Sequence, residues 1–464
     1  MRNNLALLAF LSSLSACSTI EAIELPQLSL PAVWEIQTDQ KSPVTLGEAT
    51  LWQGLGDATL AEMLKAADRQ NLDVKIAVLR LAEARAQAAR ADDERMPRVD
   101  VRAESSRGNK GDVFSGKAMS IHDIGLDASW ELDIFGQNRA RLNAANAEAI
   151  AREAEWQDVR LSLQAEIAQA YIALRAAQQQ KQLARQALQA ARTSLQLTQS
   201  LEKAGIVSGL DSTRAAREVA RYEAAIPNWK ADIATQRLRL RTLLGGSDEA
   251  FAEVLAKPAK IPHASAELVM GTPAQLLAQR PDIRARAAQL AAQSARVEEA
   301  LAAQFPKLSL GAFYGGRDTS TLPSGDVWNL AAQFVAPILS FGRIEAAIDA
   351  ADARQKQAAL AYQQAVITAL EEVEGQLVQS AQAANRAASL DASLRHATDA
   401  TRLAGERYQR GISDYLEVLE AMQSQFAIAN ETVQAQANAS TRLTALYKAL
   451  GGDLLPATAQ NTEK

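Results

Sequence analysis

Acidic side chains are the residues of this chain that could do chemistry. Glu417 and Glu420 stand three positions apart, so a helix there places both carboxylates on one face. A second set of acidic residues is spaced along one short segment and consists of Asp123, Asp127, Glu131 and Asp133. Grouped carboxylates attract cations, whereas three scattered histidines and one cysteine in 464 residues offer little for a zinc or thiol site. The residue types favour selection by charge over catalysis, and we expect no enzymatic activity, no metal centre and no bound cofactor.

The N-terminus indicates export and a lipid anchor. A basic residue and an apolar run at 5–14 precede Cys17, as in a secretory signal peptide, and the run is too short to span a bilayer permanently. Residues 14–17 are similar to the lipobox of bacterial lipoproteins, whose cysteine is acylated, and Ser18 is typical of lipoproteins sent to the outer membrane. We expect a signal peptide at 1–16 and a covalent lipid on Cys17. The alternatives are an ordinary signal peptide or a buried free cysteine.

The body of the chain consists of two internal sequence repeats. Gly136, Gly205 and the pair Gly245-Gly246 recur 206 residues later as Gly342, Gly411 and Gly451-Gly452, and Met96-Pro97 recurs 209 residues later as Phe305-Pro306. These offsets indicate that one ancestral unit was duplicated. They divide the chain into a lipid-anchored strap at 17–58, a first repeat at 59–246, an equatorial connector at 247–271, a second repeat at 272–452 and an equatorial C-terminal tail at 453–464.

Each repeat contains an alternating segment typical of a β-hairpin, at 97–135 and at 306–340. Apolar residues occupy every second position after the proline that begins each segment. In the first hairpin, the acidic set lies opposite the apolar face. Strands of about ten residues are long enough to cross an outer membrane when tilted. We therefore expect four membrane strands per chain, and the alternative is a half-buried sheet in a soluble domain.

Long helices make up the rest of each repeat. The stretch 139–204 contains neither Pro nor Gly, and large and small residues alternate along it at spacings of four and three, as in a coiled coil. At about 1.5 Å per residue, it predicts a helix roughly 100 Å long. The matching stretch is 343–410. Helices of about half this length are expected at 72–95, 210–244, 282–304 and 412–450, stacked in pairs beside the long ones.

Four strands are too few to close a barrel, and an open sheet edge cannot face lipid because its backbone groups would lack partners. Three chains supply twelve strands, which lies within the range of outer-membrane barrels. The expected fold is a membrane β-barrel joined to a long α-helical coiled-coil barrel, closed by a trimer with two repeats and four strands per chain. The acidic set then lines a water-filled lumen.

The whole mature chain resembles the TolC/OprM-like outer membrane factors, in the NodT-type lipoprotein branch of tripartite efflux systems. The resemblance rests on the order of helix, proline, hairpin, Phe-Gly and long helix, on the tip glycines and on the lipobox. It implies a homotrimer in the cell outer membrane that extends into the periplasm and contacts a periplasmic adaptor and an inner-membrane transporter. The implied function is a passive conduit for small toxic molecules or drugs.

The same resemblance assigns roles at the periplasmic tip. Glu417 and Glu420 match two family carboxylates that form acidic rings in the closed pore, although this chain has Glu where the best-known member has Asp. Asp211 is the first-repeat counterpart of Glu417. Tyr408 matches a tyrosine that ties neighbouring helices together, and Gly205 and Gly411 mark the tip turns. The alternative is that the acids are solvated surface charges and Tyr408 is a packing residue.

Other functional classes remain compatible with the pattern. One alternative is a periplasmic coiled-coil scaffold or adhesin without a pore, and another is the outer component of a protein secretion system. A formal net charge of −5 without a basic stripe argues against nucleic acid as a partner.

Overall fold

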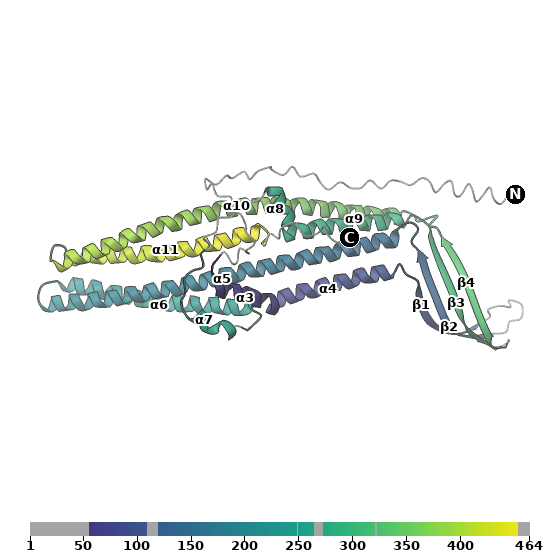
Figure 1. Ribbon diagram of the computed structural model, residues 1–464, viewed down its shortest axis with the longest axis horizontal. Helices are drawn as coiled ribbons and strands as arrows, with labels where there is room; N and C mark the ends of the chain where they lie inside the picture. The colour runs from purple at the N-terminus through teal and green to yellow at the C-terminus, as the bar shows by residue number, and fades with distance from the viewer. Residues whose placement is uncertain (1–54, 109–118, 248, 264–271, 321–322, 453–464) are drawn as a thin grey trace, which may run out of the picture.

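The protein is an elongated molecule whose helices run side by side along its length and whose sheet forms one end (Figure 1). The computed structural model describes residues 55–108, 119–247, 249–263, 272–320 and 323–452. Cys17, the signal peptide, most of the predicted strap and the C-terminal tail lie outside these residues. No helix in the described ranges has both the length and the apolar composition needed to cross a membrane.

The elements follow one order twice along the chain. The first series is α3 (Ala58–Gln70), α4 (Leu72–Asp93), β1 (Arg98–Gly108), β2 (Met119–Leu132), α5 (Gln137–Lys203) and α6 (Gly209–Leu243). The second is α8 (Pro273–Gln279), α9 (Pro281–Ala302), β3 (Lys307–Thr319), β4 (Gly325–Val335), α10 (Arg343–Gln409) and α11 (Tyr415–Ala449). Between them, the connector contains two short helical segments, η2 (Glu249–Phe251) and α7 (Ala252–Ala256).

Asn71 explains why α3 and α4 are separate helices. Its side-chain Oδ1 accepts hydrogen bonds from the backbone N–H groups of Asp73 and Val74, at 2.8 and 3.1 Å, so it caps the start of α4. Its Nδ2 donates to the Leu243 carbonyl at 2.9 Å, which fixes this break against the end of α6.

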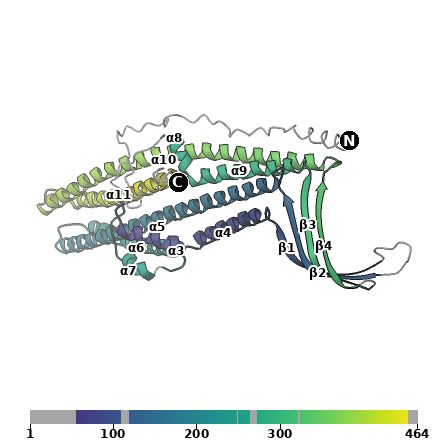
Figure 2. The ribbon, with the colours of Figure 1, turned by 45° about the vertical axis from the view of Figure 1, so that its right-hand side comes forward.

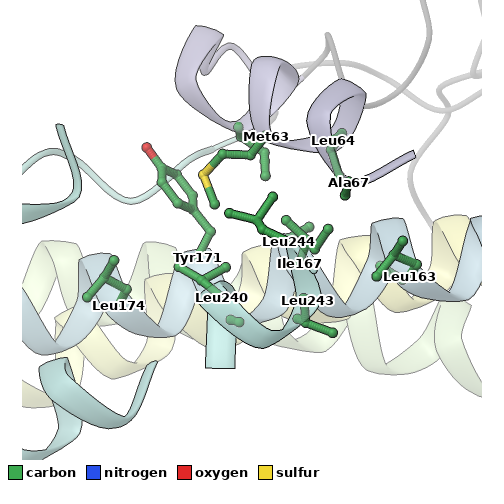
Figure 3. Packing of buried hydrophobic residues seen from close by; sticks show 14 of the residues in the cluster. Met63, Leu64, Ala67, Leu163, Ile167, Tyr171, Leu174, Leu240, Leu243 and Leu244 are labelled. Carbon is green, nitrogen blue, oxygen red and sulfur yellow. The ribbon is translucent and has the colours of Figure 1, made fainter. Parts of the chain in front are cut away.

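The main hydrophobic core lies at the middle of the molecule, where α3 packs on α5 and α6. Met63 of α3, Ile167 of α5 and Leu244, which directly follows α6, are fully buried in this equatorial core, and their side chains converge in Figure 3. Burying a side chain of this size contributes about 1.5–3 kcal/mol. The core therefore anchors the centre of the long helix α5.

Arg175 joins the short helix α7 to this core. Its guanidinium is buried, lies 4.7 Å from the Tyr171 ring centroid and donates to the Tyr171 hydroxyl at 2.9 Å. It also donates to the Lys257 carbonyl at 2.6 Å, at the end of α7. A buried charge requires such partners, and here they fix α7 against α5.

A polar cluster holds the second half of the molecule together at the same level. Arg280 is buried and donates to the Ala449 carbonyl at 2.6 Å, to Asp282 at 2.8 Å and to Glu372 at 2.7 Å. The nearby carboxyl of Asp158 is also partly buried. Burial raises the pKa of Asp158, and the negative charge of Asp282 raises it further.

The four strands form one antiparallel sheet in the order β1-β2-β3-β4. Arg98 pairs with Ser129 in the first hairpin, and Lys307 pairs with Val335 in the second. One face of the sheet is apolar and exposed. A single row across it contains Val101, Leu126, Tyr314 and Trp328. An apolar surface of this extent normally requires a covering environment.

The opposite face carries paired charges, which corrects the expectation of a strongly acidic face. Asp123 accepts from Arg317 at 2.7 Å, Glu131 lies 3.4 Å from Lys307, and Asp127 lies 3.9 Å from Arg102. The cations come from other strands, so their proximity depends on the pairing register. Three members of the predicted lumen set thus share one face that is close to balanced in charge.

Asp133, the fourth member of that set, lies outside the strand. β2 ends at Leu132, and the Asp133 carboxylate accepts from the backbone N–H groups of Asn138 and Arg139 at 2.9 and 2.8 Å. It therefore caps the first turn of α5, where the helix dipole favours a negative charge.

Two glycines allow β2 and β3 to approach closely. Gly125 and Gly315 are paired, and a Cβ atom on Gly125 would lie 2.4 Å from the Tyr314 carbonyl oxygen. A Cβ atom on Gly315 would lie 2.2 Å from the Ile124 carbonyl oxygen. The strands are visibly curved in Figure 2, and glycine is the residue that permits close backbone approach in a curved sheet.

We expect Gly125→Ala and Gly315→Ala each to destabilise the sheet by roughly 1–3 kcal/mol, because the added methyl group overlaps backbone atoms. Thermal unfolding in detergent, followed by circular dichroism, measures the effect. Gly311→Ala is the matched control, since the nearest atom to a Cβ there is 4.0 Å away. An equal loss in all three variants would contradict the close-approach explanation.

Asp158→Asn is expected to stabilise the protein at neutral pH. The folded-state pKa of Asp158 is raised, so the folded state binds its proton more tightly than the unfolded chain, and wild-type stability falls as pH rises through that pKa. The gain from the substitution should disappear below the ordinary carboxyl pKa, where both states are protonated. Denaturant unfolding at acidic and neutral pH measures this, and a gain independent of pH would point to another cause.

Candidate functional site at the helical tip

The helical hairpins α5–α6 and α10–α11 end together at the end of the molecule opposite the sheet (Figure 1). Gly205 and Gly411 form their turns with φ of 73° and 71°. The N–H of Ile206 donates to the Leu201 carbonyl at 2.9 Å, and the N–H of Ile412 repeats this bond at 3.0 Å. This pattern is a glycine helix stop, and its left-handed conformation strongly favours glycine.

One hydrophobic cluster joins all four helices near the tip. It comprises Ala215 of α6 and Tyr415 and Leu419 of α11, with Leu195 of α5 and Tyr408 of α10 packed against it. We call these five residues the tip cluster. The Ser194 hydroxyl of α5 donates to the Tyr415 hydroxyl at 2.6 Å. Packing and this hydrogen bond together hold the two hairpins side by side.

Tyr408 lies at the last turn of α10 with its ring centroid 5.9 Å from that of Tyr415. Its hydroxyl is buried and has no hydrogen-bond partner among the described residues. Burial raises the pKa of Tyr408, and the charges of Tyr415 and Asp211 raise it further. The structure thus brings Tyr408 near Asp211 without a hydrogen bond between them. The Tyr408 hydroxyl is a buried hydrogen-bond donor that no described residue accepts from.

Glu417 and Glu420 are exposed on the first turns of α11, which Asp414 caps by accepting from the Glu417 N–H at 3.2 Å. Glu417 lies 3.8 Å from Arg407, and both side chains are about half exposed. Within the described part of the chain, no cation pairs with Glu420. The two acids therefore keep most of their negative charge available to solvent.

In the first repeat, the positions that correspond to Glu417 and Glu420 hold residues of opposite charge, Asp211 and Arg214. Asp211 lies 3.7 Å from Arg214, one turn along α6. Asp211 and Glu417 share no hydrogen bond or ion pair in the described ranges. The tip acids predicted from the sequence thus fall into two groups, one beside Tyr408 and one exposed on α11.

Three residues of the tip were missed at the level of sequence. Tyr415 and Ser194 bond to each other from positions 221 residues apart, and no local pattern marks such a contact. Glu218 is buried between Arg217 and Arg221 at 3.0 and 3.2 Å. The four-residue spacing of Tyr415 and Leu419 is a local signal that could have indicated a buried helix face there.

The tip offers exposed charges and contacts between the two helical hairpins but no centre for covalent chemistry among the residues described. In those ranges, no three His, Cys, Asp or Glu side chains converge as a metal site. Its exposed carboxylates can attract cations and order water.

Known proteins place this architecture in a defined class. The family model for outer membrane efflux proteins matches residues 63–246 and 272–452, so the chain belongs to that family. The protein is accordingly an outer membrane channel protein of efflux systems. The family and its members are described by transport across the outer membrane and not as enzymes.

Individual relatives agree along nearly the whole chain. The sequence is 29% identical to the pyoverdine export outer membrane protein OpmQ of Pseudomonas putida, over 97% of each chain. It is 30% identical to the toluene efflux pump outer membrane protein TtgI of Pseudomonas putida, over 95% of this chain and 96% of the relative. The solved structure of the outer-membrane channel OprN superposes with a TM-score of 0.85 and 31% identity, over 93% of this chain and 98% of OprN.

Tyr415→Phe and Ser194→Ala should each loosen the contact between the hairpins by roughly 1 kcal/mol, because each removes the same hydrogen bond. The double variant should lose no more than either single one. Hydrogen exchange of backbone amides in the first turns of α11 measures the change. Ser200→Ala is the matched control, since its hydroxyl bonds only within α5, to the Gln196 carbonyl. Unchanged exchange in both single variants would show that this bond does not hold the tip.

Proposed function

We propose that three copies of this chain close a twelve-stranded barrel through the outer membrane, with the helices forming a tunnel into the periplasm. The observation that carries this proposal is a four-stranded sheet with one exposed apolar face and two unpaired outer edges. Lipid covers the apolar face, and neighbouring copies pair the edges. The charge-paired face then lines the water-filled lumen, with Asp123, Asp127 and Glu131 on it.

The helical part supplies the reach of the conduit. α5 and α10 each span 67 residues, which at about 1.5 Å per residue is roughly 100 Å. They carry the tip cluster far from the sheet. In this proposal, the tip meets a periplasmic adaptor and an inner-membrane transporter, and a lipid on Cys17 anchors the other end of the molecule.

The conduit carries small toxic molecules or drugs passively, and the transporter supplies the driving force. The relatives named for pyoverdine export and toluene efflux support a cargo of small molecules. The exposed apolar sheet argues against a soluble scaffold, since water would face that whole surface. A protein secretion component shares the architecture but is not favoured by these relatives.

The gate lies at the tip. Three copies of Glu417 and Glu420 form acidic rings that favour cations and bind divalent ions. Asp211 and Tyr408 lie at the contact between hairpins, where a small helix movement separates them. Gly205 and Gly411 close the turns that form the rim. Opening is a change of helix packing, without a covalent step.

Single-channel conductance in planar bilayers tests the proposal. Wild-type protein should give a small, cation-selective conductance that divalent cations block, and Glu417→Gln/Glu420→Gln should relieve that block. Asp399→Asn is the control, since Asp399 is an exposed acid that lies 3.7 Å from Arg402.

Conductance that ignores the double substitution would reject the acidic gate and leave the conduit intact. Absence of any channel, with protein that stays soluble without detergent, would reject the membrane barrel in favour of the scaffold.

A further inference from the structure

Phe341 has an unusual backbone conformation and is almost fully exposed. Its φ is 49°, and it is the one residue other than glycine with a positive φ in the described ranges. Phe341 is 88% exposed, and Ile338, three residues earlier, is 94% exposed. A strained backbone that presents an aromatic ring to solvent usually marks a contact that a single chain does not contain.

The first half of the chain contains the contact that Phe341 lacks. Phe135 is the counterpart of Phe341, 206 residues earlier, and its ring stacks on Phe305 with centroids 4.9 Å apart and planes 11° apart. Phe305 stands just before β3. Its own counterpart, 209 residues earlier and just before β1, is Met96, which is 62% exposed. Phe341 and Met96 are therefore the two unpaired members of a repeated contact.

One chain cannot bring these two residues together. Met96 leads into β1 and Phe341 follows β4, and these strands are the two outer edges of the sheet. Three strand spacings separate them, or about 14 Å. Within one chain, neither residue can therefore serve as the partner of the other.

The strand register agrees with this assignment. Arg98 and Ser129 pair in the first hairpin, and their counterparts Lys307 and Val335 pair in the second, so the same offsets hold through both hairpins. Leu132 pairs with Leu308 across the β2–β3 contact. The counterpart of Leu132, 206 residues later, is Ile338, and the counterpart of Leu308, 209 residues earlier, is Val99. If the β2–β3 pairing is repeated between copies, Ile338 of one copy lies opposite Val99 of the next.

Shifting Ala128 and Ala312 in the same way places Phe334 opposite Ala103 of the next copy. All four of these shifted positions carry apolar residues. β4 ends at Val335, three residues before Ile338, so pairing with another copy would extend this strand.

A hydrogen bond between helices also has a chemically similar counterpart at the repeat-related positions. Arg284 of α9 donates to Gln157 of α5 at 2.8 Å, and the shifted pair is Lys75 of α4 with Gln363 of α10. Both pairs join a cationic donor to an amide acceptor. The flank of α10 thus presents groups suited to α4 of another copy.

We propose that Phe341 of one copy packs on Met96 of the next, in the position that Phe305 occupies for Phe135, and thereby sets Ile338 opposite Val99 across the seam. This inference rests on the proposed assembly of three copies. It identifies the partner surface as the edge of a second copy of this chain.

Disulfide cross-linking tests the register. The variant Ile338→Cys/Val99→Cys, oxidised in detergent, should give a covalent trimer on a non-reducing gel. The matched control Phe334→Cys/Val99→Cys places both cysteines on the same sheet face but shifts the register by four residues, or about 13 Å, and should not cross-link. Protein with Cys17 as its only cysteine gives the background. Light scattering determines the oligomeric state independently.

Each outcome separates the contact from the assembly. A trimer that cross-links only through Ile338 and Val99 supports the proposed register. A trimer that cross-links through the control pair, or through neither pair, overturns the register and leaves the proposed function standing. Protein that is not trimeric at all overturns both.

A double-substitution cycle tests the ring contact itself. Phe341→Ala and Met96→Ala should each lower the temperature at which the trimer dissociates by a few degrees, and the double variant should lose no more than the larger single effect. Additive losses would show that Phe341 meets something else, such as lipid, and would reject the Met96 contact. Phe135→Ala is the control for the equivalent contact within one chain and should lower the thermal stability of the chain itself.

Discussion

Backbone hydrogen bonding at the two outer edges of the sheet is the constraint on which this molecule depends. β1 and β4 each have one edge that no strand of the same chain pairs, and the face between them is apolar. A membrane supplies no hydrogen bonds to such edges, and in the proposed barrel another copy of the chain satisfies them. Three features agree with that requirement. They are the curved sheet with its Gly125–Gly315 pair, the exposed residues Met96 and Phe341 beside the outer strands, and the repeated order of elements.

The two halves share a scaffold but differ in chemistry where they meet solvent or a neighbour. In one half the two matching positions hold opposite charges, Asp211 and Arg214, while in the other they hold two acids, Glu417 beside Arg407 and Glu420 without a cationic partner among the described residues. Duplication thus conserves the backbone geometry set by Pro and Gly. It leaves side chains free to diverge, so that a channel of like parts presents unlike surfaces around its axis.

Much of the fold could be predicted because its signals are local. Proline and glycine interrupt the helices, and a period of two marks the strands, so the long helices and the hairpins could be located from sequence alone. Asp133 lies just past the end of β2 and caps α5, and the alternation of residue types alone does not locate that strand end. The balance of charge on the sheet depends on the register that brings Arg317 to Asp123. The bond from Ser194 to Tyr415 joins residues 221 apart, beyond any local pattern.

The position of the equatorial core along α5 has a mechanical consequence. Tyr171 is fixed in that core, and the helix continues to Lys203 without interruption, a distance of about 48 Å. A rigid rod of this length that tilts by about 5° at its fixed point moves its far end by about 4 Å. That displacement is larger than the 2.6 Å between the hydroxyl groups of Ser194 on α5 and Tyr415 on α11. A small rotation of α5 about the equatorial core is therefore amplified along the helix, and at the tip it is large enough to separate Ser194 from Tyr415.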